Sequence, residues 1–264
     1  MKFFSLLFLN MICLGMFAQK PIFDMFNSAT VLIQFTNGAS ASGIVVADTN
    51  YVYLITARHV IGEYNETTKK IGLTGNEAYL VYYKKDVYSD KPDSLKINLV
   101  KLFEEGLVRI HDKQDIGIIR LGKILGHKVE TNGLITMYKS YYPDANEENK
   151  QQVGLPGIYI DLLKTFNDVN PGDEAFLFGY PKSLKITDNE TDYDYNRPLL
   201  RRGIIAGIDK NYQTIIVDCP SYQGNSGGPV YEFPFGLKDI GMVGIVSRSI
   251  LLIEQSQNSY YHYV

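Results

Sequence analysis

The sequence predicts an all-β fold, either a sandwich or a barrel. Its 264 residues include 23 Gly, 20 Tyr and 13 Phe but no Trp, a mixture that favours strands and tight turns. Short apolar or alternating runs recur along the chain, each bounded by turn residues, which is the pattern of many short strands. Beyond the N-terminus, the sequence has no apolar run long enough to cross a bilayer and no internal repeat.

The first half of the chain has five such runs. The first is Thr-Val-Leu-Ile-Gln-Phe, which is apolar, partly β-branched and closed by the turn pair Asn37-Gly38. The third follows a polar turn at residues 48–50 and is rich in Tyr and aliphatic side chains. The strands predicted here are 30–35, 43–46, 51–56, 78–83 and 116–121.

The second half repeats the pattern after a polar stretch. Residues 139–152 are rich in Lys, Glu, Asn and Tyr, so we place there the boundary between two β units. We therefore expect a first unit at 19–138, a connection at 139–165 and a second unit at 166–264. The strands predicted in the second unit are 174–179, 200–208, 214–217, 228–231, 242–247 and 260–264.

Charge and motifs exclude several classes of function. The chain has 26 Lys+Arg and 29 Asp+Glu, a net charge of -3, which argues against a nucleic-acid partner. It has no His-Glu-x-x-His motif and no phosphate-binding loop, so we expect no metal and no cofactor. Loop 186–196 alternates acidic residues at a spacing that suits Ca²⁺, but Tyr193 and Leu199 stand where an EF-hand needs Gly and Glu. A solvated acidic loop is favoured.

The N-terminus reads as a secretory signal peptide. Residues 1–18 begin with a positive charge at Lys2 and continue with a short apolar stretch that ends at Ala18. A membrane anchor is the alternative, disfavoured because the run is short. Of the two cysteines, Cys13 would leave with the signal, so the mature chain would hold only Cys219 and no internal disulfide. We expect an exported protein, periplasmic or secreted, with no membrane association after signal removal.

The strongest local motif is Gln-Gly-Asn-Ser-Gly-Gly-Pro at residues 223–229. Glycines on both sides of Ser226 allow a sharp turn that exposes the hydroxyl and brings backbone amides together, the arrangement that holds an oxyanion. A Gly-rich turn before the strand at Val230 is the alternative interpretation.

A serine nucleophile needs a base, and the base needs an orienting acid. Among the four His, His59 sits at the end of a buried-looking strand, where the scaffold fixes it, although a packed core histidine would occupy the same place. Asp115 leads directly into an apolar strand, whereas Asp112 lies among polar residues and looks solvated. The resulting order of His59, Asp115 and Ser226 disfavours the α/β-hydrolases, which run Ser, acid, His, and it is the order of chymotrypsin-like enzymes.

Five segments together resemble the trypsin-like serine peptidases of the chymotrypsin fold, most closely the bacterial HtrA/Deg-like branch. They are Leu-Ile-Thr-Ala-Arg-His-Val at 54–60, Asp-Ile-Gly-Ile-Ile-Arg-Leu at 115–121, Phe-Gly-Tyr-Pro at 178–181, Gly-Asn-Ser-Gly-Gly-Pro at 224–229 and Gly-Ile-Val-Ser at 244–247. The resemblance implies two six-stranded antiparallel β-barrels with the active site in the crevice between them, and a polypeptide substrate. The resemblance also implies a bacterial origin. The first barrel would carry His59 and Asp115, and the second would carry Ser226.

The resemblance also assigns supporting roles. The amides of Gly224 and Ser226 would form the oxyanion hole, and Ser247 would support the buried acid and begin the substrate-binding strand. Pro220 would lie at the base of the primary pocket, which does not support a preference for Arg or Lys. Ser221, Ser249 and His262 would form a polar pocket that suits an acidic side chain.

Two departures from the family pattern matter. Asn225 replaces the Asp that pairs with a newly cut N-terminus in zymogen-activated members, so we expect activity without propeptide cleavage. The sequence runs to Val264, directly after the expected last strand, so we expect neither the C-terminal helix nor the PDZ module of a full HtrA protease. The alternative function is a catalytically silent binding or scaffold protein on the same fold, its crevice capped by the insertions at 64–77, 84–96 and 127–152.

Overall fold

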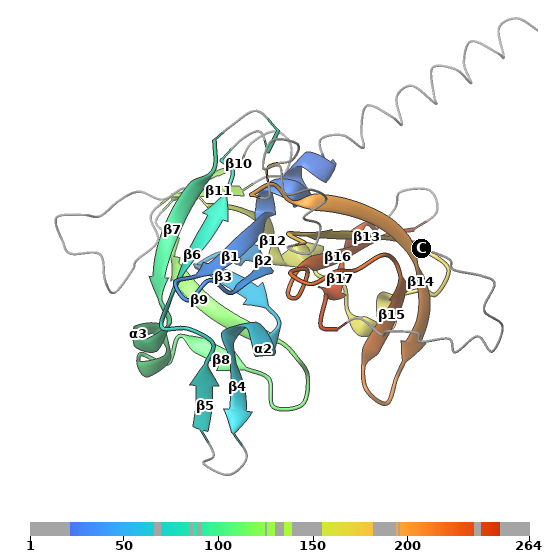
Figure 1. The fold of residues 1–264 in the computed structure, drawn as a ribbon. Coiled ribbons are helices and arrows are strands. Elements are labelled where there is room, and N and C mark those ends of the chain that lie inside the picture. Colours follow the sequence, from blue (N-terminus) through green and yellow to red (C-terminus); the bar gives the residue numbers. More distant parts are fainter. Residues whose placement is uncertain are drawn as a thin grey trace, which may run out of the picture.

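The structure, a computed structural model, contains two curled β-sheets that lie side by side (Figure 1). It describes residues 22–65, 70–84, 87–88, 91–124, 126–129, 135–138, 155–181, 194, 196–234 and 239–248. Within these ranges the first sheet has ten strands and the second has five. The two-barrel, chymotrypsin-like fold class is therefore confirmed.

The first sheet curls around its own apolar core. Its central strands run β7-β6-β1-β2, and β3 joins β2 to β9 and β8, all as antiparallel neighbours. These strands are β1 (Thr30–Phe35), β2 (Ser40–Ala47), β3 (Tyr51–Thr56), β6 (Glu77–Tyr82), β7 (Asp93–Asn98), β8 (Val108–Ile110) and β9 (Gly117–Lys123). The short helices α2 (Arg58–Ile61) and α3 (Leu99–Glu104) follow β3 and β7, and a separate hairpin consists of β4 (Gly62–Asn65) and β5 (Lys70–Leu73).

Three further strands of the first sheet precede the second sheet in the chain. β10 (Gly126–Val129) pairs with β11 (Ile135–Tyr138), which pairs with β12 (Leu155–Tyr159). β12 then pairs with β2 in parallel, within the segment predicted as the connection between the units. The 3-10 turns η2 (Ile160–Leu162) and η3 (Phe166–Asp168) lead into the second sheet. The domain bounds themselves stay a prediction.

The second sheet is antiparallel, in the order β15-β14-β13-β16-β17. Its strands are β13 (Glu174–Gly179), β14 (Leu199–Asp209), β15 (Thr214–Asp218), β16 (Pro229–Phe233) and β17 (Gly241–Ile245). The expected final strand at 260–264 lies outside the described residues, as do the predicted signal at 1–18 and all of the acidic loop 186–196 except residues 194 and 196.

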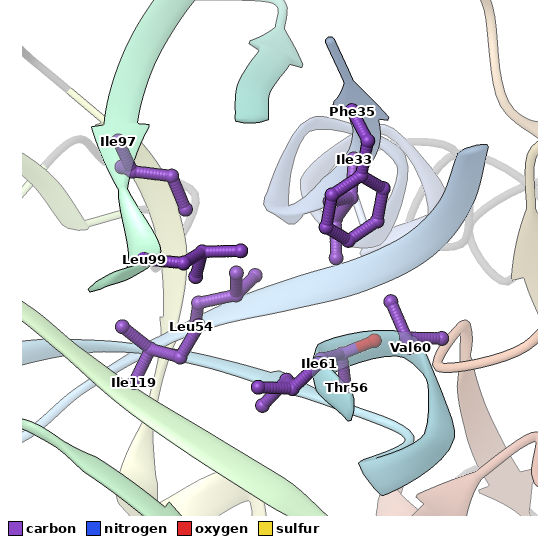
Figure 2. Close-up of a pocket in the computed structure, with 9 residues that line it drawn as sticks. All are labelled: Ile33, Phe35, Leu54, Thr56, Val60, Ile61, Ile97, Leu99 and Ile119. Atoms are coloured by element: carbon purple, nitrogen blue, oxygen red, sulfur yellow. The ribbon is translucent and has the colours of Figure 1, made fainter. Parts of the chain in front are cut away.

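Each sheet has an apolar core, and a third core joins them. Val31, Leu54 and Leu80 belong to the core of the first sheet, and Leu177 and Ile205 belong to that of the second. A small cavity in the first core has apolar walls apart from the Thr56 hydroxyl, and its volume of about 10 Å³ holds at most one water, so it is no ligand site (Figure 2). The third core combines strands of both sheets with a helical segment, residues 22–29.

Helical residues 22–29 pack at the junction between the sheets (Figure 1, blue). Phe26 is fully buried and stacks on Tyr231 of β16 with ring centroids 3.6 Å apart. The same core takes Ile44 from β2 and Phe178 from β13. Because one cluster contains residues of both sheets, burial of its apolar surface holds the two sheets against each other. No helix within the described ranges is long and apolar enough to span a membrane.

Candidate active site

His59 and Asp115 lie at the same end of two paired strands. β3 ends at Thr56, which pairs with Gly117 at the start of β9. His59 follows β3 on α2, and Asp115 precedes β9, so the pairing of the strands brings the two side chains together. His59 Nδ1 lies 2.8 Å from Asp115 Oδ2, and the His59 backbone amide donates to Asp115 Oδ1 at 3.0 Å. Two contacts to one carboxylate fix the orientation of the imidazole ring.

Ser247 completes the surroundings of the acid. Its hydroxyl, just beyond β17, donates to Asp115 Oδ2 at 2.6 Å. This contact links the second sheet to the acid of the first, as the resemblance implied for Ser247. Asp112, the competing acid, has a side chain that is 83% exposed and lies 3.6 Å from His111 instead. The structure therefore brings Asp115, and not Asp112, to His59.

The pKa values of the pair are displaced in opposite directions. The hydrogen bond to Asp115 raises the pKa of His59 above its ordinary value, although partial burial lowers it. Burial raises the pKa of Asp115, but the hydrogen bonds from His59 and Ser247 outweigh burial and hold that pKa below its ordinary value. The His59 side chain remains 42% exposed, so the ring is oriented by the scaffold yet reachable by a substrate.

The loop that carries Ser226 is attached to the first sheet through Ser42 of β2. The Ser42 amide donates to the Ser226 carbonyl at 2.9 Å, and the Ser42 hydroxyl donates to the Gly224 carbonyl at 2.8 Å. The same hydroxyl accepts the amide of Tyr180 at 2.9 Å, and Ser42 is fully buried. Sequence reasoning missed Ser42, because its partners in the Ser226 loop lie at least 182 positions away and nothing local marks it.

Gly227 shows how close the loop comes to His59. Its φ is +82°, and a Cβ there would lie 2.0 Å from Thr56 Oγ1 and 2.9 Å from the backbone nitrogen of Ala57. Only glycine fits such a position. The residue after Ser226 thus touches the chain two residues before His59. The hydroxyl of Ser226 forms no hydrogen bond to His59 in the described part of the molecule.

Successive peptide groups in the loop have defined directions. The Asn225 amide donates to the Tyr222 carbonyl, the Asn225 carbonyl accepts from Gly228, and the Gly227 amide donates to the Val246 carbonyl. A trans peptide points its N–H and C=O in opposite directions, so the Ser226 amide points away from the amide of Gly228. Within the described ranges the amides of Gly224 and Ser226 have no hydrogen-bond partner. These are the two donors predicted for the oxyanion hole.

The remaining predicted residues are less completely placed. The Ser221 hydroxyl is buried and has no hydrogen-bond partner among the residues that the structure describes. Cys219 is a free thiol whose pKa is raised by burial. Ser249 and His262 lie outside the described residues, so the polar specificity pocket stays a prediction. Across the described ranges no group of three His, Cys, Asp or Glu is placed to hold a metal ion.

The chain is similar to several solved structures at low sequence identity, and the similarity to the first of them supports the fold. Deg5 has a TM-score of 0.50 and 14% identity over 88% of this chain and 86% of its own. A serine endoprotease from Yersinia pestis has a TM-score of 0.47 and 15% identity, and this chain spans 58% of its length. An HtrA-type protease solved with a tripeptide has a TM-score of 0.41 and 11% identity, with 56% of its length spanned. No curated protein sequence matches this chain significantly.

One family match covers most of the chain. The trypsin-like peptidase domain matches residues 41–233, which run from β2 to the end of β16 and include His59, Asp115 and Ser226. The match therefore includes strands of both sheets and the loop between β15 and β16, but not β1 or β17. This chain belongs to the trypsin-like peptidase family and is a serine protease.

Proposed function

We propose that this protein is an exported endopeptidase that hydrolyses peptide bonds with Ser226 as nucleophile, His59 as base and Asp115 as orienting acid. The observation that carries the proposal is the contact of Gly227 with Thr56 and Ala57, which places the Ser226 loop beside the His59–Asp115 pair. Three segments from both sheets thus meet at one point, as acyl transfer by a serine requires.

The first half of the reaction forms an acyl-enzyme. Ser226 Oγ bonds to the scissile carbonyl carbon while His59 Nε2 takes the hydroxyl proton, and Asp115 stabilises the imidazolium that results. The carbonyl oxygen becomes an oxyanion that the amides of Gly224 and Ser226 stabilise. The C–N bond then breaks, and the amine leaves with the proton that His59 returns.

The second half regenerates the enzyme. Water attacks the ester carbon while His59 takes its proton, and collapse of the second tetrahedral intermediate releases the acid and returns the proton to Ser226. These reaction steps need a hydrogen bond between Ser226 and His59. Catalytic hydrogen bonds are often long in the free enzyme and shorten when substrate binds, so we expect this one to form in the substrate complex.

The proposal combines export with activity that does not depend on cleavage of the N-terminus. Residues 1–18 have the pattern of a secretory signal, and residues of the helical segment 22–29 belong to the core between the sheets. We expect the form that keeps residues 1–18 to be as active per mole as the form cleaved after Ala18. Steady-state kinetics on both forms measure this, and inactivity of the longer form would contradict it.

The proposed nucleophile is tested with a fluorophosphonate probe. We expect the folded protein to be labelled at Ser226, because an activated serine attacks phosphorus and the oxyanion-hole amides stabilise the product. Mass spectrometry of the digested adduct locates the label. Ser226→Ala should remove the label, whereas the exposed Ser94→Ala should keep it. An unlabelled wild-type protein would instead favour the silent scaffold.

A further inference from the structure

Two consecutive arginines in β14 have opposite surroundings. Burial alternates along this strand, so Arg201 is half-buried while Arg202 is exposed. Arg202 pairs with Glu174 on the outer face, where both side chains are largely in water. Arg201 points to the other face, toward the loop that precedes Ser226. The two residues thus offer a matched comparison on one strand.

The Arg201 guanidinium binds two residues of that loop. With the Asn225 amide oriented so that its oxygen faces the surrounding donors, Arg201 Nη1 donates to Asn225 Oδ1 at 2.9 Å. The guanidinium carbon also lies 4.7 Å from the ring centroid of Tyr222, a cation–π distance. Asn225 is fully buried, so its oxygen needs these donors.

Asn225 and Tyr222 in turn close the loop upon itself. The Tyr222 amide donates to Asn225 Oδ1 at 3.0 Å, and the Asn225 amide donates to the Tyr222 carbonyl at 3.0 Å. Gly224 lies inside this closed turn with a φ of +99°. The direction of its amide therefore depends on the turn, and the turn depends on the residues at its two ends. Glycine is conformationally free, so these contacts restrict the directions that its amide can take.

We propose that Arg201 is a positioning residue that holds the turn 222–225 in the conformation in which the Gly224 and Ser226 amides bind the oxyanion. This inference rests on the proposed function, since it names what orders that site. Arg201 takes no part in bond making. Its guanidinium is planar and always charged, so it can donate a hydrogen bond to the Asn225 amide and contact the Tyr222 ring at the same time.

The test compares Arg201→Ala with Arg202→Ala by the kinetics of fluorophosphonate labelling at Ser226. We expect kinact to fall about 10²-fold in Arg201→Ala, as when an oxyanion-hole donor is lost, with KI changed less than about threefold. Arg202→Ala should stay within about twofold of wild type, because a surface ion pair contributes little. Methylguanidine added to Arg201→Ala should restore kinact at least in part and leave Arg202→Ala unchanged.

A second variant covers the case in which Arg201→Ala does not fold. Arg201→Lys keeps the charge and the aliphatic stem but loses the planar fork, and its kinact should fall about tenfold. Equal labelling of wild type, Arg201→Ala and Arg201→Lys, with all three folded by circular dichroism, would overturn the inference alone. Absence of label on folded wild type would overturn the proposed function and this inference with it.

Discussion

Asp115→Asn should lower kcat about 10⁴-fold while the protein stays folded, an effect of the size known for loss of the orienting acid. His59 Nδ1 lies 2.8 Å from Asp115 Oδ2, and the His59 amide and Ser247 hydroxyl also donate to the carboxylate. An Asn side chain that turns its NH₂ toward Nδ1 makes that nitrogen an acceptor, so the proton moves to Nε2. Nε2 then cannot take the proton of Ser226. Peptide hydrolysis and probe labelling measure the loss.

The control is Asp112→Asn, because this acid is close in sequence but exposed and faces His111. Its kcat should match that of wild type. The pH profile adds an independent readout. The base acts when neutral, and Asp115 raises the pKa of His59, so wild-type kcat/KM should rise with pH through a pKa above that of free histidine. In Asp115→Asn the residual activity should rise at lower pH. If the activity of wild type and that of Asp115→Asn rose through the same pKa, Asp115 would not determine the pKa of His59.

Glu232→Ala should lower the free energy of unfolding by about 3–5 kcal/mol, because it leaves the buried ammonium group of Lys164 without its partner. Glu232 lies on β16 with 0% exposure and forms an ion pair with Lys164, whose side chain is 12% exposed. It also accepts the amide of Asn170 at 2.7 Å. Both partners would be left unsatisfied. Thermal denaturation should show a fall in Tm of about 10 °C, by the usual relation for a chain of this size.

Two variants decide whether the ion pair causes that loss. Glu174→Ala removes an exposed pair with Arg202 from the same sheet and should change stability by less than about 1 kcal/mol. The double variant Lys164→Met/Glu232→Met should recover most of the stability lost in Glu232→Ala, since an apolar pair leaves no charge unpaired. If Glu232→Ala were no less stable than Glu174→Ala, the buried pair would have no structural role.

The strands that sequence analysis predicted best are those with strong local patterns. The runs at 30–35, 51–56 and 174–179 coincide with β1, β3 and β13, because apolar or aromatic side chains dominate each run. β7 was not predicted, since its Asp-Ser-Leu-Lys-Ile-Asn sequence has only two apolar residues. Helical residues 22–29 were also missed, because eight residues are fewer than the window of about 11–18 residues in which helical periodicity can be recognised.

For the site, the sequence located the residues with chemistry but not those that hold them. His59, Asp115 and Ser226 lie in recognisable segments whose residue types already suit acyl transfer. Arg201 could be distinguished from Arg202 only once the register of β14 against β13 was known, because one step along a strand reverses the face. The fold creates such contacts, so local sequence does not report them.

Ser42 couples the readiness of the nucleophile to the completion of folding. It reaches the carbonyls of Gly224 and Ser226 across the boundary between the sheets, and 182 positions separate Ser42 from Gly224. Contacts between such distant segments carry a large loop-closure cost and depend on the docked arrangement. In a molecule whose second sheet has formed but has not yet docked on the first, Ser42 therefore does not hold the carbonyls of Gly224 and Ser226 in place. Peptidase activity would then appear only at the last stage of folding, and nascent or partly unfolded copies would not cleave neighbouring molecules.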